Sequence, residues 1–281
     1  MSYLNETQVP KILIISHNLY DVTNNIGKTL VALFDDWPKE KIAQIYFRND
    51  LPSFKYCEQY FCITDKDVLK SAVSFGKKEA GIEVKTVDSL ELSNAEVGLY
   101  QVGNHRHPSV SLMRDTLWEL ANWRGTKLEE WVRKVNPDII LFVPNDYCLA
   151  YEVALYVQNI VRKPIIPFYM DDSFYYNCST TFIDKYRRRK LRKLAQRVHQ
   201  NVNKIFTICD YMSSEYEQVF KKKCQSFVNC TTIETISNQP STRDVSVISY
   251  LGNLHSNRWK SLVEIGQAID CINEEEKRTI E

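Results

Sequence analysis

The sequence predicts an α/β protein built on a Rossmann-like parallel sheet, and two observations lead to this fold class. Short apolar runs such as Lys11–Ser16 and Asp138–Val143 punctuate the chain. Runs of this length suit strands that are buried on both faces of a parallel sheet. Between the runs lie segments whose apolar residues recur at helical spacing. This alternation of strand and helix favours a doubly wound sheet.

Residues 11–75 are predicted to form three strands and two helices. The apolar residues Ile26, Leu30 and Leu33 line one face of a helix that Pro38 ends. Asp65 is expected to cap a second helix that runs to about Phe75. The strands are expected at 11–16, 41–47 and 59–64. The stretch 77–107 gives no clear pattern beyond one strand at 97–102.

From residue 109 onward the alternation of helix and strand continues. Helices are expected over 109–135, with a break near Gly125, and Pro144 stops the strand at 138–143. A helix face at 149–160 precedes a strand at 164–169. A long helix over 180–202 leads to a strand at 204–209. Asp210 is expected to cap the helix 211–221, and a short strand at 226–229 follows.

A second α/β unit is predicted to open near the end of the sequence. The polar segment 237–244 contains Pro240, and the apolar run from Val245 follows it, then a turn at Gly252 and an amphipathic helix. We therefore expect an acceptor-side domain at 1–236, a linker at 237–244 and an incomplete domain at 245–281. On this prediction the chain holds one complete domain and only the first strand and helix of another.

Composition narrows the class of protein. The 281 residues are 44% apolar with a net charge of +1, which describes a globular chain without a global field for nucleic acid. No run of about 18 apolar residues occurs, and the first ten residues lack a signal-peptide core. The eight cysteines form no CxxC pair, which favours a reducing, cytoplasmic environment without disulfides.

Parallel sheets bind ligands beyond the carboxyl ends of their strands, so residues that directly follow each strand are the candidates. His17 follows the first strand, either to hydrogen-bond ligand hydroxyls or to satisfy the loop backbone. Asn145 and Asp146 follow the strand at 138–143. Asp171 and Asp172 follow the strand at 164–169, where one suits general-base work or hydroxyl binding and the other a helix cap.

The segment Asn25–Thr29 contains Gly27-Lys28-Thr29, which invites comparison with a P-loop. The pattern fails because Val22 stands where the first glycine is required. Two interpretations remain. The segment is a plain helix start, or Gly27 and Lys28 let a substrate approach a helix N-terminus that favours anionic or polar oxygens.

No metal site is predicted. A third carboxylate is not evident near Asp171 and Asp172, and His105 and His107 have no cysteine or further histidine nearby.

A basic amphipathic helix is predicted around Lys185–Lys193, with apolar residues such as Leu191 and Leu194 on one face. Three interpretations stay open. The helix packs on the sheet with a solvated outer face, it contacts anionic lipid head groups as a peripheral membrane element, or it binds nucleic acid. The last is disfavoured because aromatic residues do not interleave with the cations.

The turn after the final apolar run does not follow the dinucleotide fingerprint, because its six residues begin Gly252-Asn253-Leu254. One glycine at a strand end with Arg258 and Lys260 nearby suits a diphosphate held by backbone N–H groups and cations. A simple strand–helix turn with exposed cations is the alternative.

The order of these segments resembles family-4 glycosyltransferases of the GT-B fold, and bacterial capsule and surface-polysaccharide transferases are the most similar. The resemblance spans nearly the whole chain. The segments that carry it are Ile12–Ser16, Gly27–Thr29, Leu33–Pro38, Ile42–Tyr46, Asn136–Ile140, Tyr169–Asp172, Ile208–Tyr216 and Tyr250–Leu254 with Asn257-Arg258.

This resemblance implies transfer of a sugar from a nucleoside-diphosphate sugar to a hydroxyl of a glycan or lipid-linked acceptor, with retention of configuration and no cofactor or required metal. It places Asp171 or Asp172 at the acceptor, Gly27 facing the donor phosphates, and Gly252, Asn253, Arg258 and Lys260 at the donor diphosphate. Asn253 stands where many members have arginine.

The paired glutamates that hold the donor in this family have no counterpart up to Glu281, so the chain alone is expected to have little or no transferase activity. The rival hypothesis is a non-catalytic module that binds acceptors or oligomerises.

Overall fold

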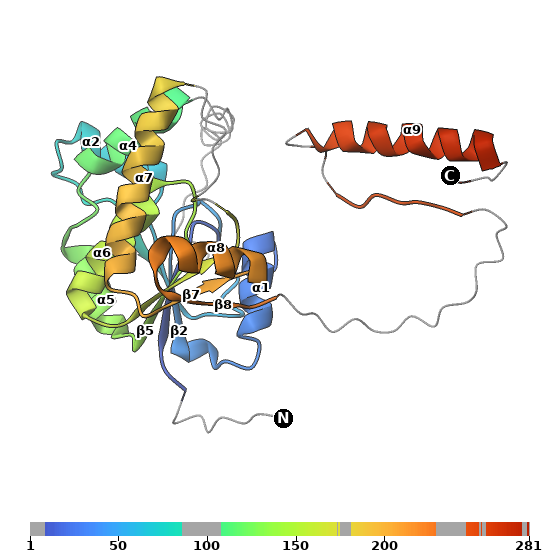
Figure 1. Cartoon of the computed structure of the whole chain (residues 1–281). Helices are drawn as coiled ribbons and strands as arrows, with labels where there is room; N and C mark the ends of the chain where they lie inside the picture. The colour runs from blue at the N-terminus through green and yellow to red at the C-terminus, as the bar shows by residue number, and fades with distance from the viewer. Residues whose placement is uncertain are drawn as a thin grey trace. The chain divides into compact units, whose positions relative to one another are not determined.

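A computed structural model describes residues 9–85, 108–172, 174, 181–228, 246–252, 254, 257–276 and 280 (Figure 1). The chain divides into two compact units, Met1–Thr231 and Thr232–Glu281, and each is described by itself. The predicted linker at 237–244 and the predicted strand at 97–102 lie outside the described residues.

The first unit is a Rossmann-like α/β structure, which confirms the predicted fold class. Its sheet has eight strands in the order β4-β3-β2-β1-β5-β6-β7-β8. Every neighbouring pair is parallel except β3 and β4, which are antiparallel. The strands are β1 (Ile12–Ile15), β2 (Ile42–Tyr46), β3 (Gln59–Cys62), β4 (Ile82–Val84), β5 (Ile139–Phe142), β6 (Ile165–Tyr169), β7 (Lys204–Thr207) and β8 (Lys223–Ser226).

Helices connect the strands, and none in the described part of the chain is long and apolar enough to cross a bilayer. The helices of the first unit are α1 (Asn25–Leu33), the 3-10 turn η2 (Lys39–Lys41), α2 (Asp65–Val73), α4 (Pro108–Leu120), α5 (Thr126–Val135), α6 (Cys148–Val161), α7 (Phe182–Gln200) and α8 (Asp210–Phe220).

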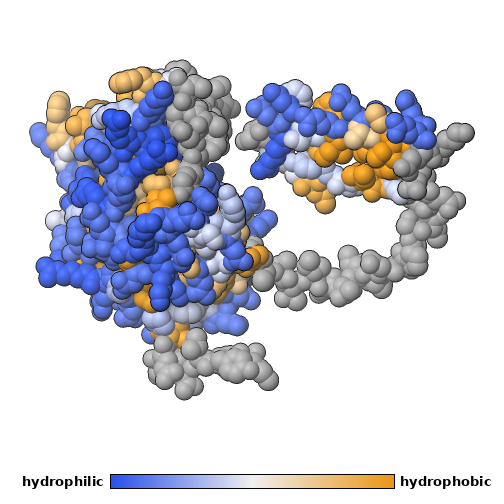
Figure 2. Space-filling view, viewed as in Figure 1, coloured by the Kyte–Doolittle hydropathy of each residue, from blue (hydrophilic) through white to orange (hydrophobic). Residues whose placement is uncertain are grey.

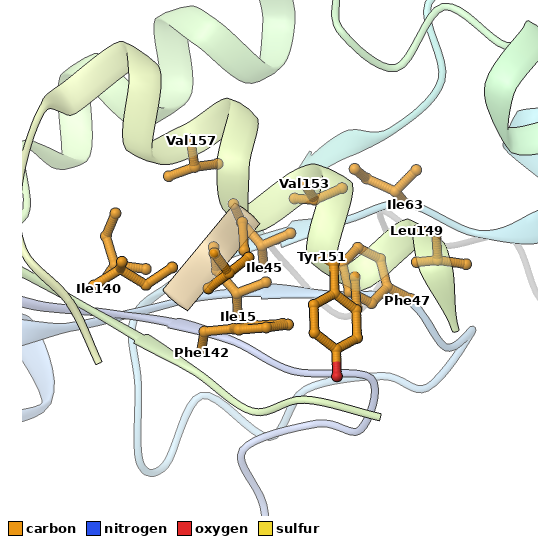
Figure 3. Packing of buried hydrophobic residues seen from close by; sticks show 14 of the residues in the cluster. Ile15, Ile45, Phe47, Ile63, Ile140, Phe142, Leu149, Tyr151, Val153 and Val157 are labelled. Carbon is orange, nitrogen blue, oxygen red and sulfur yellow. The ribbon is translucent and has the colours of Figure 1, made fainter. Parts of the chain in front are cut away.

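Side chains that alternate along the central strands feed two separate cores. Leu13 and Ile15 of β1 pack with α6 in one cluster, whereas Ile12 and Ile14 pack with Leu30 of α1 in the other. Figure 3 shows Ile15 in the first cluster beneath α6. Both faces of the sheet are therefore apolar, which explains why the strands read as unbroken apolar runs.

The strand order reverses at β1. The chain first builds outward from β1 through β2 to β3, and then returns to the other side of β1 with β5 and continues to β8. Such a reversal is a topological switch point, where loops at the carboxyl ends of the two central strands separate and leave a crevice for ligands. The loops that follow β1 and β5 are therefore the candidate ligand-binding region.

Several element boundaries differ from the sequence predictions. β8 covers Lys223–Ser226 instead of 226–229, and β4 was not predicted. Both are short strands at the two described edges of the sheet, and β8 alternates exposed and partly buried side chains, so neither carries a buried apolar run.

Two predicted helix caps were displaced by one residue. Thr64, not Asp65, caps α2 in a capping box with Asp67, and Cys209 is the N-cap of α8, so that Asp210 is its first residue. The long helix is α7, close to the predicted span. All six cysteines that the structure describes are free, namely Cys57, Cys62, Cys148, Cys209, Cys224 and Cys271.

In the second unit, the helix α9 (Arg258–Glu276) is present where a helix was predicted. The strand expected from Val245 is not: residues 247–251 form no strand, and a single parallel bridge joins Ser246 to Ile280. A parallel strand needs hydrogen-bonding neighbours along its length, and the described residues of this unit supply only that bridge.

Candidate functional site

Gln44, a buried residue in the middle of β2, anchors the loop after β1. Its Oε1 accepts a hydrogen bond from the Tyr20 N–H at 2.9 Å, and its Nε2 donates to Ser16 Oγ at 2.8 Å and to the Asn18 carbonyl at 2.9 Å. One side chain therefore satisfies three polar groups of residues 16–20. Sequence reasoning missed it, although a single amide inside the apolar run Ile42–Tyr46 was the available signal.

The start of α1 is closed by its own cap. Asn24 Oδ1 accepts from the Gly27 N–H at 2.7 Å, Asn24 Nδ2 donates to the Leu19 carbonyl at 2.9 Å, and the Lys28 N–H donates to the Asn24 carbonyl at 2.9 Å. The amides of Gly27 and Lys28, which the sequence placed toward a substrate, are thus already used within the turn. The Lys28 residue is exposed.

Gly27 is also tightly enclosed. A Cβ at this position would lie 2.0 Å from the Asp21 carbonyl oxygen and 2.5 Å from the Leu19 carbonyl oxygen. The requirement for glycine therefore comes from the fold-back of the loop 19–24 against α1. No phosphate is needed to explain it.

The loops after β1 and β5 bring His17 and Asn145 to the switch point. The strands that carry them are adjacent, and the Val143 N–H at the end of β5 donates to the Ile15 carbonyl at 2.8 Å. The imidazole of His17 lies 5.0 Å from the ring of Tyr147, centroid to centroid. Asn145 Oδ1 accepts from the Tyr147 N–H at 2.9 Å. Both predicted residues therefore contact Tyr147.

Each of these two residues presents a buried polar nitrogen without a partner among the described residues: Nδ1 of His17 and Nδ2 of Asn145. Buried polar atoms are almost always hydrogen-bonded, and an unsatisfied one costs about 1–3 kcal/mol. Two of them lie beside one aromatic ring, after the two strands that meet at the switch point, and are candidates for binding a polar ligand.

The guanidinium of Arg114 contacts the ring of Tyr147. Arg114 of α4 lies with its guanidinium carbon 4.2 Å from the centre of the Tyr147 ring. Its Nε donates at 2.8 Å to Asp65 Oδ1, and Trp118 Nε1 donates to the same oxygen at 2.7 Å. Asp65, the expected cap, is instead the anchor of this arginine. The sequence offered no local signal for Arg114.

Burial, followed by the nearby cations Arg114 and Arg48, lowers the pKa of His17 to about 3, and Asp65 only partly opposes this. The imidazole is therefore neutral at physiological pH. In that state one ring nitrogen donates and the other accepts. A neutral ring suits uncharged hydroxyl groups better than it suits an anion.

The carboxylate and the backbone carbonyl of Asp146 both accept hydrogen bonds from arginines of α7. Its carboxylate accepts from Arg188 Nη1 at 3.1 Å, and its backbone carbonyl accepts from Arg187 Nη2 at 3.4 Å. Arg187 also pairs at 3.0 Å with the buried Asp115 of α4. Asp146 thereby fastens the loop after β5 to α7.

Asp171 and Asp172 lie beyond the end of β6, one strand further from the switch point than Asn145. Both residues are exposed. Tyr216 of α8 donates its hydroxyl to Asp172 Oδ1 at 3.1 Å, and this contact adds to burial in raising the pKa of Tyr216. Asp172 therefore orients toward α8, whereas Asp171, which is also exposed, stays a predicted contact for a substrate hydroxyl.

The predicted diphosphate residues belong to the second unit. Arg258 begins α9, and the Lys260 N–H donates to the Asn257 carbonyl at 3.0 Å within its first turn. Gly252 is crowded by its neighbour, since a Cβ there would lie 2.7 Å from the Tyr250 hydroxyl. Asn253 lies outside the described residues. Within the described part of the chain no cluster of three or more His, Cys, Asp or Glu side chains could hold a metal ion.

Replacing Gly27 tests whether the loop is built around this glycine. We expect Gly27→Ala to lower the free energy of unfolding by about 3 kcal/mol, because the added methyl meets two backbone oxygens that cannot rotate away. Chemical denaturation followed by circular dichroism measures it. Gly266→Ala in α9 is the matched control, since a Cβ there meets no atom within 4 Å. Equal midpoints for the two variants would contradict the crowding.

The titration of His17 tests its burial. Its pKa of about 3 lies below the ordinary value of 6.5, so the unfolded chain binds this proton more readily than the folded protein. Stability from this residue is complete above pH 6.5 and falls, by up to about 1.4 kcal/mol per pH unit, as the pH drops toward 3. NMR of the imidazole signals, assigned with His17→Gln, should show no titration between pH 5 and 8. A midpoint near 6.5 would show an open, solvated ring.

Comparison with known proteins assigns no family to the chain. The sequence matches no model of a known protein family. It likewise matches none of the curated protein sequences. The resemblance to family-4 glycosyltransferases therefore stays a prediction, and the function has to be argued from the residues at the switch point.

Proposed function

We propose that this protein is a glycosyltransferase whose first unit binds the hydroxyl-bearing acceptor at the switch point between β1 and β5. The single observation that carries the proposal is the pair of buried nitrogens, His17 Nδ1 and Asn145 Nδ2, that have no partner among the described residues. Sugar hydroxyls both donate and accept hydrogen bonds, so one acceptor can satisfy both the ring nitrogen and the amide.

The charge balance around the site favours a neutral acceptor. Arg114, Arg187 and Arg188 each pair with a carboxylate, from Asp65, Asp115 and Asp146 respectively. Arg48, the other cation that acts on His17, pairs with Asp50 at 3.0 Å, so each of these arginines has a carboxylate beside it. The neutral imidazole of His17 points to the same chemistry.

In the proposed reaction, residues of the first unit bind the acceptor and residues of the second unit bind the donor. The bond between the anomeric carbon and a diphosphate oxygen breaks, and a bond from that carbon to the acceptor oxygen forms. The acceptor proton leaves to the nucleoside diphosphate or to water. His17 and Asn145 orient the acceptor, and with a pKa of about 3 His17 is a weak base, so its role is hydrogen bonding. Asp171 is the carboxylate available to polarise the hydroxyl.

The donor side of the proposal rests on Gly252, Asn253, Arg258 and Lys260. Cations and backbone N–H groups stabilise a leaving diphosphate because negative charge develops on it as the glycosidic phosphate bond breaks. Two of these residues, Arg258 and Lys260, lie in the first turn of α9.

A second candidate function is a non-catalytic module that binds acceptors or oligomerises through its second unit. The observation that favours it is the exposed apolar surface of that unit: Leu251 is 96% exposed, and Trp259 and Val263 are each 50% exposed. Light scattering distinguishes the two candidates, since a concentration-dependent dimer supports the module and a strict monomer counts against it.

Substitution of Asn145 tests the acceptor site directly. The protein is incubated with a panel of UDP- and GDP-sugars and an oligosaccharide library, and nucleoside diphosphate release and glycan binding are both measured. We expect His17→Ala and Asn145→Ala each to weaken acceptor binding about fivefold, which corresponds to one lost hydrogen bond of about 1 kcal/mol.

The matched control is Asn159→Ala, which removes an exposed amide from α6 beside Arg162, at the opposite end of the sheet. It should bind and release like the unmodified protein. Acceptor binding that survives both switch-point substitutions would rule out the site. Acceptor binding by a concentration-dependent dimer would instead support the non-catalytic module.

A further inference from the structure

The helix α7 carries far more positive charge than its packing uses. It spans Phe182–Gln200 and is about 28 Å long at 1.5 Å per residue. Its buried side chains, among them Leu191, Leu194 and Val198, face the first core cluster. The basic side chains of α7 form two sets, one partly buried and one exposed.

Three partly buried cations of α7 are paired with neighbouring acids. Arg187 pairs with Asp115, Arg188 pairs with Asp146, and Lys190 pairs with Glu119. These contacts attach α7 to α4 and to the loop after β5. They belong to the fold and are not available to a partner.

The outward side chains form a different set, which we call the α7 stripe. All its members are exposed and lie within about a third of the helix circumference at 100° per residue: Phe182, Lys185, Tyr186, Arg189, Lys193, Gln196, Arg197 and Gln200. The stripe contains four cations and no acid. In the described part of the chain, no ion pair joins these four cations to a carboxylate.

Two aromatic side chains stand at one end of the stripe. The Thr181 hydroxyl accepts from the Asp184 N–H at 3.2 Å and starts the helix directly before Phe182. Phe182 is 86% exposed, and Tyr186, one turn further, is 56% exposed. Figure 2 shows hydrophilic side chains gathered over the region that α7 occupies in Figure 1.

We propose that the α7 stripe is a docking surface for an anionic lipid bilayer. A straight row of cations lies along a membrane plane and meets its anionic head groups, while Phe182 and Tyr186 enter the interfacial region. The net charge of the whole chain is only +1, so the attraction comes from this row and not from a global field. The inference depends on α7 alone and stands whether or not the protein transfers sugars.

Nucleic acid is the rival partner for such a row. Its recognition usually combines cations with aromatic side chains interleaved among them, for base stacking. In the stripe the aromatics are confined to the first turns, and the cations continue alone for three more turns. A membrane uses this segregated arrangement better than a nucleic acid does.

Vesicle binding tests the proposal on the full chain. The protein is sedimented with phosphatidylcholine vesicles that contain about 30% phosphatidylglycerol. The bound fraction is compared with that on neutral phosphatidylcholine vesicles. Arg189→Glu/Lys193→Glu should lower the partition coefficient for anionic vesicles at least about 30-fold, because each cation near a charged surface contributes about a factor of 5. Phe182→Ala/Tyr186→Ala should reduce binding in high salt, where the electrostatic part is screened.

The matched control is Lys77→Glu/Lys223→Glu, which makes the same change in net charge at exposed lysines outside α7. It should retain most of the binding. Equal loss in the control and the stripe variant, equal binding to neutral and anionic vesicles, or a stripe-dependent preference for duplex RNA over anionic vesicles in competition would each overturn the proposal.

Discussion

The two-sided pairing of β1 is the constraint on which the rest of the first unit depends. β1 is hydrogen-bonded in parallel to β2 on one side and to β5 on the other. Because a parallel strand in this position is covered on both faces, all four of its side chains are buried. Since both neighbours run parallel to β1, the loops that follow β1 and β5 leave the sheet at the same edge. His17 and Asn145 follow these paired strands, and both contact Tyr147.

Polar contacts made by three side chains hold the groups around the switch point, and those of Gln44 are buried. Gln44 holds the loop that carries His17, Asp65 holds Arg114 against Tyr147, and Asp146 ties the loop after β5 to α7. Unpaired buried polar atoms are costly, so the buried contacts of Gln44 constrain the loop after β1 to a narrow set of conformations. His17 Nδ1 and Asn145 Nδ2 are buried and have no hydrogen-bond partner among the described residues.

The fold was largely predictable from the sequence, whereas the site was only partly so. Apolar runs such as Asp138–Val143 identify buried strands because burial on both faces leaves no polar positions. The edge strand β8 escaped because its alternating, partly exposed residues carry no such run. Asp65 was assigned to a cap, but a tertiary contact with Arg114 claims it. The strand rule indicated His17 and Asn145. It could not indicate Arg114 or Gln44, whose roles arise only when distant segments meet.

The two outermost described strands have a consequence for how the protein behaves when crowded. An open sheet edge exposes backbone groups that can recruit a strand from another copy. β4 is only three residues long, and its Glu83 is bridged to Lys134. β8 displays Lys223, and beside it Lys204 binds Gln225. Short length at one margin and charge at both make these margins poor templates for strand addition, so the sheet is protected against edge-to-edge fibril growth by residues that have no part in any binding site.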